Sequence, residues 1–269
     1  MRAEKFYLKN RQGLKIAVLV EFNNDAKGLA FVMHGLGGFK EQDHIRIFSQ
    51  AFLEEGCTVV RFDTTNTLGE SDGNYEDATT TNYFHDLEDV IVWARKQEWY
   101  QQPFWLCGHS LGGIATILYA EEYPERVKGL APISTVVSGK LSLTSARYQG
   151  NDVLQGWQET GWKIEKSSSR PGVIKRLKWS HMEDRMKYDV LEEVDNLTMP
   201  VLMIVGSEDE TTPLKHQQIL FDKLPGKKEL HIIKDALHTF RDEKQLAEIK
   251  TIMVNWIRKV QHGFSTDYL

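Results

Sequence analysis

The most constraining feature of this 269-residue chain is a Gly-x-Ser-x-Gly pentapeptide centred on Ser110. An apolar, strand-like run at 104–107 precedes it, and an apolar, helix-like run at 112–123 follows it. A serine on such a sharp strand-to-helix turn presents its hydroxyl above the helix N-terminus, where a developing negative charge is favoured. Glycines on both sides let the strand and the helix approach each other closely. We therefore expect Ser110 to act as a nucleophile.

The same pattern occurs a second time, at 69–73 around Ser71. No apolar run follows this copy, because residues 74–81 are polar and turn-like. The context therefore favours Ser110 over Ser71 as the nucleophile. The alternative role for Ser110 is that of an ordinary helix N-cap, a position at which serine is common.

Segments of strand and helix character alternate along most of the chain. Strands are expected at 5–9, 14–22, 29–33, 58–62, 103–107, 127–133, 200–205 and 227–233, and helices at 45–55, 80–97, 112–123 and 246–260. Such alternation predicts an α/β fold with a mostly parallel central sheet and helices on both faces. The first two strands are expected to pair in antiparallel fashion.

The alternation stops between residue 134 and about residue 195, where no run typical of a buried strand occurs. This excursion is longer than a crossover with a single helix requires. We interpret residues 134–190 as a cap inserted into one α/β core, which is formed by residues 1–133 and 191–269.

The amino-acid composition limits the classes of binding partner and the cellular locations that we expect. A formal charge of −5 and a pI near 6.0 give no support for nucleic-acid binding. The N-terminus lacks the apolar segment of a signal peptide, and no run of about 18 apolar residues occurs, so we expect a cytoplasmic protein without a membrane span. Cys57 and Cys107 lie in apolar segments and are expected to be buried free thiols. A homodimer is a further expectation.

A serine hydroxyl needs a base to remove its proton, and that base needs a third group to hold it in the right tautomer. Asp209 follows the strand at 200–205, and His238 follows the strand at 227–233. Both positions belong to the sheet edge at which Ser110 is expected. The chain order Ser, Asp, His is also the order expected on a sheet of this kind.

Alternatives to this pair of residues remain. Glu208 or Glu210 could replace Asp209, although the spacing to a following proline favours Asp209. His231 lies inside a strand run, which favours a packed or solvated strand histidine over a base. His109 adjoins Ser110 but comes too early in the turn to face its hydroxyl.

Four segments together resemble the α/β-hydrolase superfamily over nearly the full length of the chain. They are residues 34–38 (His-Gly-Leu-Gly-Gly), 108–112 (Gly-His-Ser-Leu-Gly), 206–213 (Gly-x-x-Asp-x-x-x-Pro) and 238–240 (His-x-Phe). Within the superfamily the chain is most similar to small bacterial carboxylesterases of the cinnamoyl (feruloyl) type, and next to monoacylglycerol lipases. The similarity to these esterases includes residues 61–63 and 69–73, whereas 64–68 (Thr-Thr-Asn-Thr-Leu) replaces their usual Gly-rich stretch.

The resemblance implies a role for each residue of the expected site. Ser110 is the nucleophile, His238 the base and Asp209 the group that orients it. The oxyanion hole is formed by the backbone N–H groups of Leu36 and Leu111. His34 is expected to shape the oxyanion loop by hydrogen bonding.

The expected cap suggests two interpretations of substrate recognition. Residues 140–187 hold ten Lys/Arg and five Asp/Glu. This excess of positive charge is typical of a solvated face, or it attracts anionic or amphiphilic substrates. Trp157 and Trp162 are expected to bind substrate, with packing of the cap onto the core as the alternative.

Neither a metal nor a nucleotide cofactor is expected. No His/Cys/Asp cluster has metal-ligand spacing, and no Gly-x-Gly-x-x-Gly opens a helix after the first strand. The other histidines, for which no partner pattern is visible, are expected at the surface: His44, His85, His181, His216 and His262.

The resemblance implies a serine carboxylester hydrolase that acts through an acyl-enzyme on a small-molecule ester. Small to medium acyl esters are expected, either aromatic (cinnamoyl-type) or short-chain. The alternatives are a monoacylglycerol lipase-like enzyme, thioester, C–C bond or peracid chemistry on the same residues, and a ligand receptor that retains them.

Overall fold

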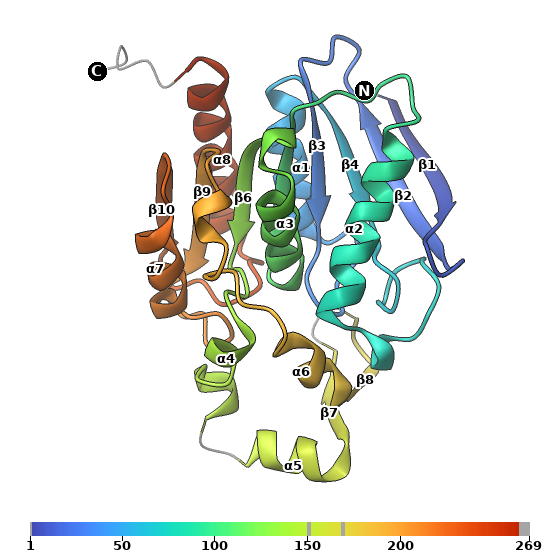
Figure 1. The fold of residues 1–269 in the computed structure, drawn as a ribbon, viewed down its shortest axis with the longest axis vertical. Helices are drawn as coiled ribbons and strands as arrows, with labels where there is room; N and C mark the ends of the chain where they lie inside the picture. The colour runs from blue at the N-terminus through green and yellow to red at the C-terminus, as the bar shows by residue number, and fades with distance from the viewer. Residues whose placement is uncertain (1, 150–151, 168–169, 264–269) are drawn as a thin grey trace.

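A computed structural model describes residues 2–149, 152–167 and 170–263 (Figure 1). An eight-stranded sheet runs through the centre, in the order β1-β2-β4-β3-β5-β6-β9-β10. Its strands are β1 (Arg2–Lys9), β2 (Lys15–Phe22), β3 (Gly28–Met33), β4 (Cys57–Phe62), β5 (Phe104–His109), β6 (Val127–Ile133), β9 (Val201–Gly206) and β10 (Lys228–Ile233). β1 pairs with β2, and β2 with β4, in antiparallel fashion, and the remaining neighbours are parallel. The predicted mostly parallel sheet is confirmed.

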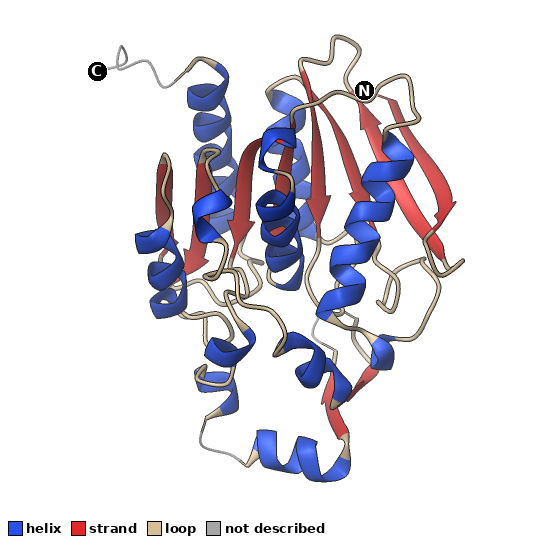
Figure 2. Cartoon of the chain, in the orientation of Figure 1, coloured by secondary structure: helices blue, strands red, loops and turns tan. Residues whose placement is uncertain are grey.

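Helices cover both faces of the sheet, as predicted (Figures 1 and 2). α1 (Asp43–Glu54) and α8 (Glu243–Gln261) pack on one face, and α2 (Thr80–Ala94), α3 (Leu111–Glu122) and α7 (Leu214–Lys223) pack on the other. Successive strand residues supply the two cores alternately, because side chains of a strand point to opposite faces. Phe31 and Met33 belong to the core beneath α2 and α3, and Ala30 and Val32 to the core beneath α1 and α8.

Helix α7 was not predicted from the sequence. Only three of its ten side chains are buried, and two of these, His216 and Gln217, are polar. The helix therefore lacks the apolar periodicity by which an amphipathic helix is identified.

The segment between β6 and β9 lies beyond the carboxyl ends of the parallel strands (Figure 1). It contains α4 (Gly139–Ser142), α5 (Val153–Thr160), α6 (Ser180–Arg185) and an antiparallel hairpin of β7 (Trp162–Lys166) and β8 (Ile174–Lys178). The sequence did not predict this hairpin, since its strands are short, charged and mostly unburied. The division into a core and a cap at residues 134 and 190 stays a prediction. Single 3-10 turns occur at Tyr75–Asp77, Pro124–Arg126, Ala146–Tyr148 and Val194–Asn196.

Two further expectations concern the chain as a whole. Cys57 and Cys107 are buried and free, as predicted. Among the described residues, no helix combines the length and the apolar character that a membrane crossing requires. The cytoplasmic location and the homodimer stay predictions.

Candidate active site

Ser110 occupies the turn between β5 and α3 in a backbone conformation that L-residues rarely adopt, with φ 55° and ψ −113°. Such strain persists only where the surrounding structure enforces it. A Cβ added at Gly108 would lie 2.2 Å from the carbonyl oxygen of Gly112, and one at Gly112 would lie 2.5 Å from that of His34. The glycines of the pentapeptide are therefore required by the close approach of strand, helix and neighbouring loop.

The structure brings Ser110, His238 and Asp209 together from the ends of three strands. Ser110 Oγ lies 2.9 Å from His238 Nε2, and His238 Nδ1 lies 2.8 Å from Asp209 Oδ2. Because a carboxylate only accepts, Nδ1–H donates to Asp209 and leaves Nε2 free to accept the Ser110 proton. The arrangement can therefore deprotonate the hydroxyl during attack on an electrophile.

Asp209 is held as a buried carboxylate. The N–H groups of Thr211 and Thr212 donate to its Oδ1 at 2.9 and 2.8 Å, and the Thr212 hydroxyl lies 2.9 Å from Oδ2. Burial alone would raise the pKa of Asp209, but His238 and Thr212 outweigh it and hold that pKa below its ordinary value. The carboxylate is therefore charged at neutral pH.

The alternatives that the sequence left open lie elsewhere. Glu208 and Glu210 are exposed, on either side of the buried Asp209. His231 lies on β10, with its Nε2 3.0 Å from Glu229 Oε2. Ser71 donates its hydroxyl to the carbonyl of Asp63 and accepts from the N–H of Ala17, both contacts with the backbone.

His109 has a positioning contact that the sequence analysis missed. Its Nε2–H donates to the backbone carbonyl of His238 at 2.8 Å, and the two rings lie 4.9 Å apart. Burial, reinforced by the neighbouring His238, lowers the pKa of His109 to about 3. A neutral His109 therefore anchors the loop that carries His238.

The expectation that the remaining histidines lie at the surface was wrong for three of them. His44, His181 and His216 are all buried, the last two with hydrogen bonds to Ala78 and Thr144. His44 packs against the ring of His109 at 4.7 Å. These environments form from segments far apart in the chain, so no local pattern marks them. His85 is half-buried and His262 is exposed.

Two backbone donors flank Ser110 where the oxyanion hole was expected. Leu36 lies in the loop after β3 and lines the same cavity as Ser110, and Leu111 is the first residue of α3. Within the described part of the chain, neither Leu36 N–H nor Leu111 N–H has a hydrogen-bond partner. Both donors are therefore available to a ligand at Ser110.

Several hydrogen bonds hold the loop that carries Leu36. His34 Nε2 accepts from the N–H of Thr64 at 3.1 Å, which assigns the other ring proton to Nδ1, and Nδ1–H donates to Gly35 O at 2.8 Å. The Tyr83 hydroxyl donates to the same carbonyl at 2.9 Å. His34 thus makes the kind of contacts expected of a residue that shapes this loop.

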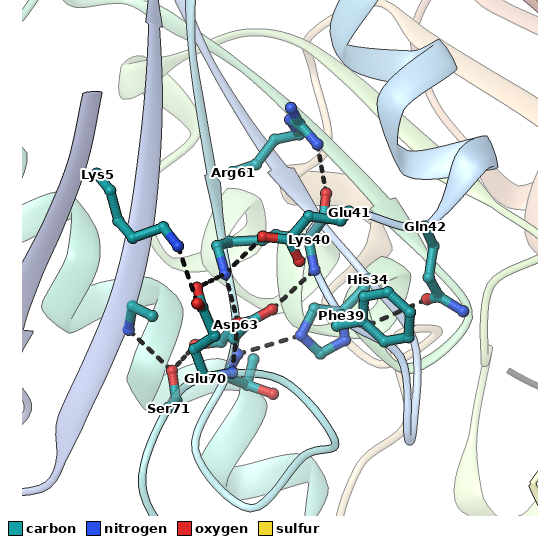
Figure 3. A network of polar contacts seen from close by, with 12 residues as sticks. Lys5, His34, Phe39, Lys40, Glu41, Gln42, Arg61, Asp63, Glu70 and Ser71 are labelled. Carbon is teal, nitrogen blue, oxygen red and sulfur yellow. Dashed lines mark hydrogen bonds and ion pairs between the residues drawn. The ribbon is translucent and has the colours of Figure 1, made fainter. Parts of the chain in front are cut away.

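A buried ion network fixes the continuation of this loop (Figure 3). Lys40 Nζ lies 2.7 Å from Asp63 Oδ2 and 2.7 Å from Glu70 Oε2, and Lys40 N–H also donates to Asp63 at 2.7 Å. The guanidinium of Arg61 donates to the backbone carbonyl of Lys40. The segment that follows β4 therefore holds the loop that follows β3.

A cavity of about 270 Å³ opens onto Ser110 and His238. Its described lining includes six Lys/Arg side chains and one carboxylate, that of Glu165. Five of these cations come from residues 140–187, the part of the expected cap that was predicted to carry an excess of positive charge. Its charge therefore faces the candidate site and not only solvent.

The structure places neither of the two expected substrate-binding tryptophans in the lining of this cavity. Trp157 is buried, donates its Nε1–H to Leu177 O at 3.0 Å and packs edge-on against Trp179. Trp162 lies beneath the guanidinium of Arg176, 4.4 Å from it. This placement agrees with the packing alternative, and a contact with substrate stays a prediction.

Metal ligation finds no support in the described ranges, where no group of three or more His, Cys, Asp or Glu residues could hold an ion.

The chain matches a known protein family over most of its length. Residues 24–245 match the profile of the family described as serine aminopeptidase, S33. The chain belongs to this family. The mostly parallel sheet with helices on both faces is the α/β-hydrolase fold, so both the predicted superfamily and the predicted fold class are confirmed.

Individual S33-like relatives are distant. An uncharacterized 31.7 kDa Escherichia coli protein encoded between traX and finO is 24% identical, covering 93% of this chain and 97% of its own length. The mouse mitochondrial palmitoyl-protein thioesterase ABHD10 is 22% identical over 80% of this chain and 69% of its own. A thermostable monoacylglycerol lipase from a Bacillus species is 22% identical over 77% of this chain and 81% of its own.

Among solved structures, Est1E from Butyrivibrio proteoclasticus bound to ferulic acid has a TM-score of 0.81. It is 21% identical, and the alignment covers 96% of this chain and 99% of Est1E. At this identity the likeness establishes a shared fold. The family match and the hydrogen-bonded Ser110, His238 and Asp209 together identify the chain as a serine hydrolase of the α/β-hydrolase type.

Proposed function

We propose that this protein is a serine carboxylester hydrolase that works through an acyl-enzyme. The observation that carries the proposal is the chain of hydrogen bonds from Ser110 Oγ through His238 to the buried Asp209. Beside it lie two backbone N–H groups with no partner among the described residues. Neither a serine hydroxyl nor an ester carbonyl is reactive enough alone. His238 can activate the hydroxyl, and the backbone donors can stabilise the charge that develops on the carbonyl oxygen.

The reaction follows from these contacts in two halves. Ser110 Oγ attacks the ester carbonyl while His238 Nε2 takes its proton, and the N–H groups of Leu36 and Leu111 stabilise the oxyanion. The C–O bond to the alcohol breaks as His238 returns the proton to the leaving oxygen. Water then attacks the acyl-enzyme with His238 again as base, releasing the acid and restoring Ser110.

The side chains that line the cavity favour some of the substrate classes named for the relatives over others. An aminopeptidase must bind the α-ammonium group of a peptide, which calls for free carboxylates, whereas the only described lining carboxylate, Glu165, is already paired with three cations. A long alkyl chain, such as palmitoyl, would desolvate these cations without pairing them, which is costly. Small to medium acyl esters, including the aromatic type represented by ferulic acid in Est1E, suit a cavity of about 270 Å³.

Active-site substitution with a matched serine control tests the proposal. Ser110→Ala should abolish turnover in a panel of p-nitrophenyl esters of rising chain length plus methyl ferulate, and should abolish the burst of p-nitrophenol that an acyl-enzyme produces. Ser71→Ala changes a serine in the same sequence pattern but bonded only to backbone groups, and should retain most of the activity per folded molecule.

Substantial turnover by folded Ser110→Ala protein would contradict the assignment. Absence of any burst or turnover in the wild type, with ligand binding intact, would favour the receptor alternative. A preference for thioesters over matched oxygen esters would favour thioesterase chemistry on the same residues.

A further inference from the structure

Three of the cations that line the cavity share a single carboxylate. Glu165 lies 2.8 Å from Arg147, 2.8 Å from Lys163 and 2.7 Å from Lys175. One negative charge therefore faces three positive ones, and the side chains of Lys163 and Lys175 are only 14% and 11% exposed. Water can compensate the excess only in part.

Arg185 adds a fourth cation, and it is buried without a carboxylate. It is 5% exposed and forms no ion pair with any described residue. Its Nη2 donates to Nε2 of His181 at 2.8 Å, and His181 Nδ1–H donates to Ala78 O, so this histidine is neutral. The Nε–H of Arg185 is buried and has no hydrogen-bond partner in the part of the chain that the structure describes.

The hairpin directs its charges toward the cavity by simple alternation. Lys163 pairs with Leu177, and Glu165 with Lys175, so these four side chains share one face of the β7–β8 ladder. All four line the cavity. Arg176 lies on the other face, exposed and against Trp162, and does not line the cavity.

The titratable groups at this wall respond to the uncompensated charge. Burial lowers the pKa of Lys163, and the nearby Arg147 lowers it further. Burial would raise the pKa of Tyr148, but Arg185, Lys163 and Arg147 together lower it below the ordinary value. Buried cations that outnumber their anionic partners are costly, and an anionic ligand is the natural compensation.

We propose that Arg147, Lys163, Lys175 and Arg185, the cationic wall, bind a carboxylate or phosphate group carried by the ester substrate. The inference rests on the proposed function, because it names the substrate class of the same site. Guanidinium groups match both anions in shape, and ammonium groups add charge. The wall and Ser110 line one cavity, so the anion and the reacting carbonyl belong to one small molecule.

Matched pairs of esters test the proposal. For a carboxylate on the acyl half, p-nitrophenyl hydrogen adipate is compared with p-nitrophenyl hexanoate. For a phosphate on the alcohol half, 1-hexanoylglycerol 3-phosphate is compared with 1-hexanoylglycerol. In at least one pair the anionic member should have the higher kcat/KM, and Lys163→Gln or Arg147→Gln should reduce the anionic-to-neutral ratio by about 10- to 100-fold.

Arg176→Gln removes the same charge from the opposite face of the same hairpin and should leave that ratio unchanged. Arg185→Gln should lower the ratio as well, but Arg185 is buried and its replacement is expected to impair folding. The test therefore depends on Lys163 and Arg147, which are less buried. The proposal would be overturned if the neutral ester had the same kcat/KM as the anionic ester in both pairs. It would also be overturned if neither Lys163→Gln nor Arg147→Gln changed the anionic-to-neutral ratio.

Binding to the Ser110→Ala protein separates this inference from the proposed hydrolysis. Calorimetric titration with the same ester pairs should show tighter binding of an anionic member, reduced by Lys163→Gln but not by Arg176→Gln. Such a preference without turnover in the wild type would support the anion site and reject the hydrolase. Turnover of neutral esters with no anionic preference in either measurement would do the reverse.

Discussion

Replacement of Lys40 by Met tests how the loop carrying Leu36 is held. Lys40 is fully buried, and its Nζ lies within 2.8 Å of carboxylate oxygens of Asp63, Glu70 and Glu41 (Figure 3). Burial opposes its charge, but the hydrogen bonds that Lys40 donates to Asp63, Glu41 and Glu70 raise its pKa above the ordinary value. Lys40→Met keeps the length of the side chain and leaves the fully buried Asp63 without its cation.

The magnitude follows from the burial of the pair. Removing one partner of a buried ion pair costs about 3–5 kcal/mol, because the other charge stays buried and uncompensated. For a chain of this size about 2–4 °C of melting temperature accompanies each kcal/mol, so Tm should fall by roughly 6–20 °C. The kcat of the proposed ester hydrolysis should fall too, because Asp63 also binds the N–H of Lys40 in the loop.

Lys5→Met provides the matched control in a urea titration. Lys5 lies 2.8 Å from the same Glu70, but its side chain is 42% exposed, so its ion pair is screened by water and its loss should change stability little. The double variant Lys40→Met/Asp63→Leu should be less destabilised than the sum of its single variants. A cost for Lys40→Met no larger than that for Lys5→Met, or strict additivity in the double variant, would refute the reasoning.

Two other predictions concern stability. Burial raises the pKa of Glu121 from 4.5 to about 8, so its contribution to stability is complete below pH 4.5 and is lost as the pH rises through about 8. Glu121→Gln should remove this loss of stability, which is at most about 5 kcal/mol at about 1.36 kcal/mol per pH unit. The unfolding free energies of the wild type and of Glu121→Gln are compared between pH 5 and pH 9. Equal dependence on pH in the two proteins would contradict the prediction. Trp157→Ala removes a buried aromatic side chain, which should lower the free energy of unfolding by about 3–5 kcal/mol and lower Tm. It should reduce kcat/KM for acetyl and aryl esters alike. Trp162→Ala should have a smaller effect on Tm, because Trp162 packs against the exposed Arg176. A selective loss on methyl ferulate with unchanged Tm would instead identify the tryptophan as a substrate contact.

Local patterns predicted the parts of the protein that depend on nearby residues. The apolar runs on both sides of Ser110 predicted β5 and α3, because a buried strand or helix must be apolar wherever it packs. The polar residues after the later strands predicted that Asp209 and His238 lie near Ser110, because parallel strands end at one edge of a sheet. The sequence also shows that residues 140–187 carry twice as many Lys/Arg as Asp/Glu.

Tertiary structure alone decided which side chains are buried and what they face. Asp209 is buried between two exposed glutamates, and the sequence offered all three, since they lie within three consecutive positions. The burial of His44 and His181, and the direction of Lys163 and Lys175 into the cavity, depend on elements that pack from distant parts of the chain. The sequence by itself thus determined the α/β sheet, the serine turn and the chemistry available at the strand ends. Only the folded chain decided which carboxylate holds His238 and that Arg185 is buried without an ion pair to any described residue. Those outcomes depend on long-range packing, which no local pattern encodes.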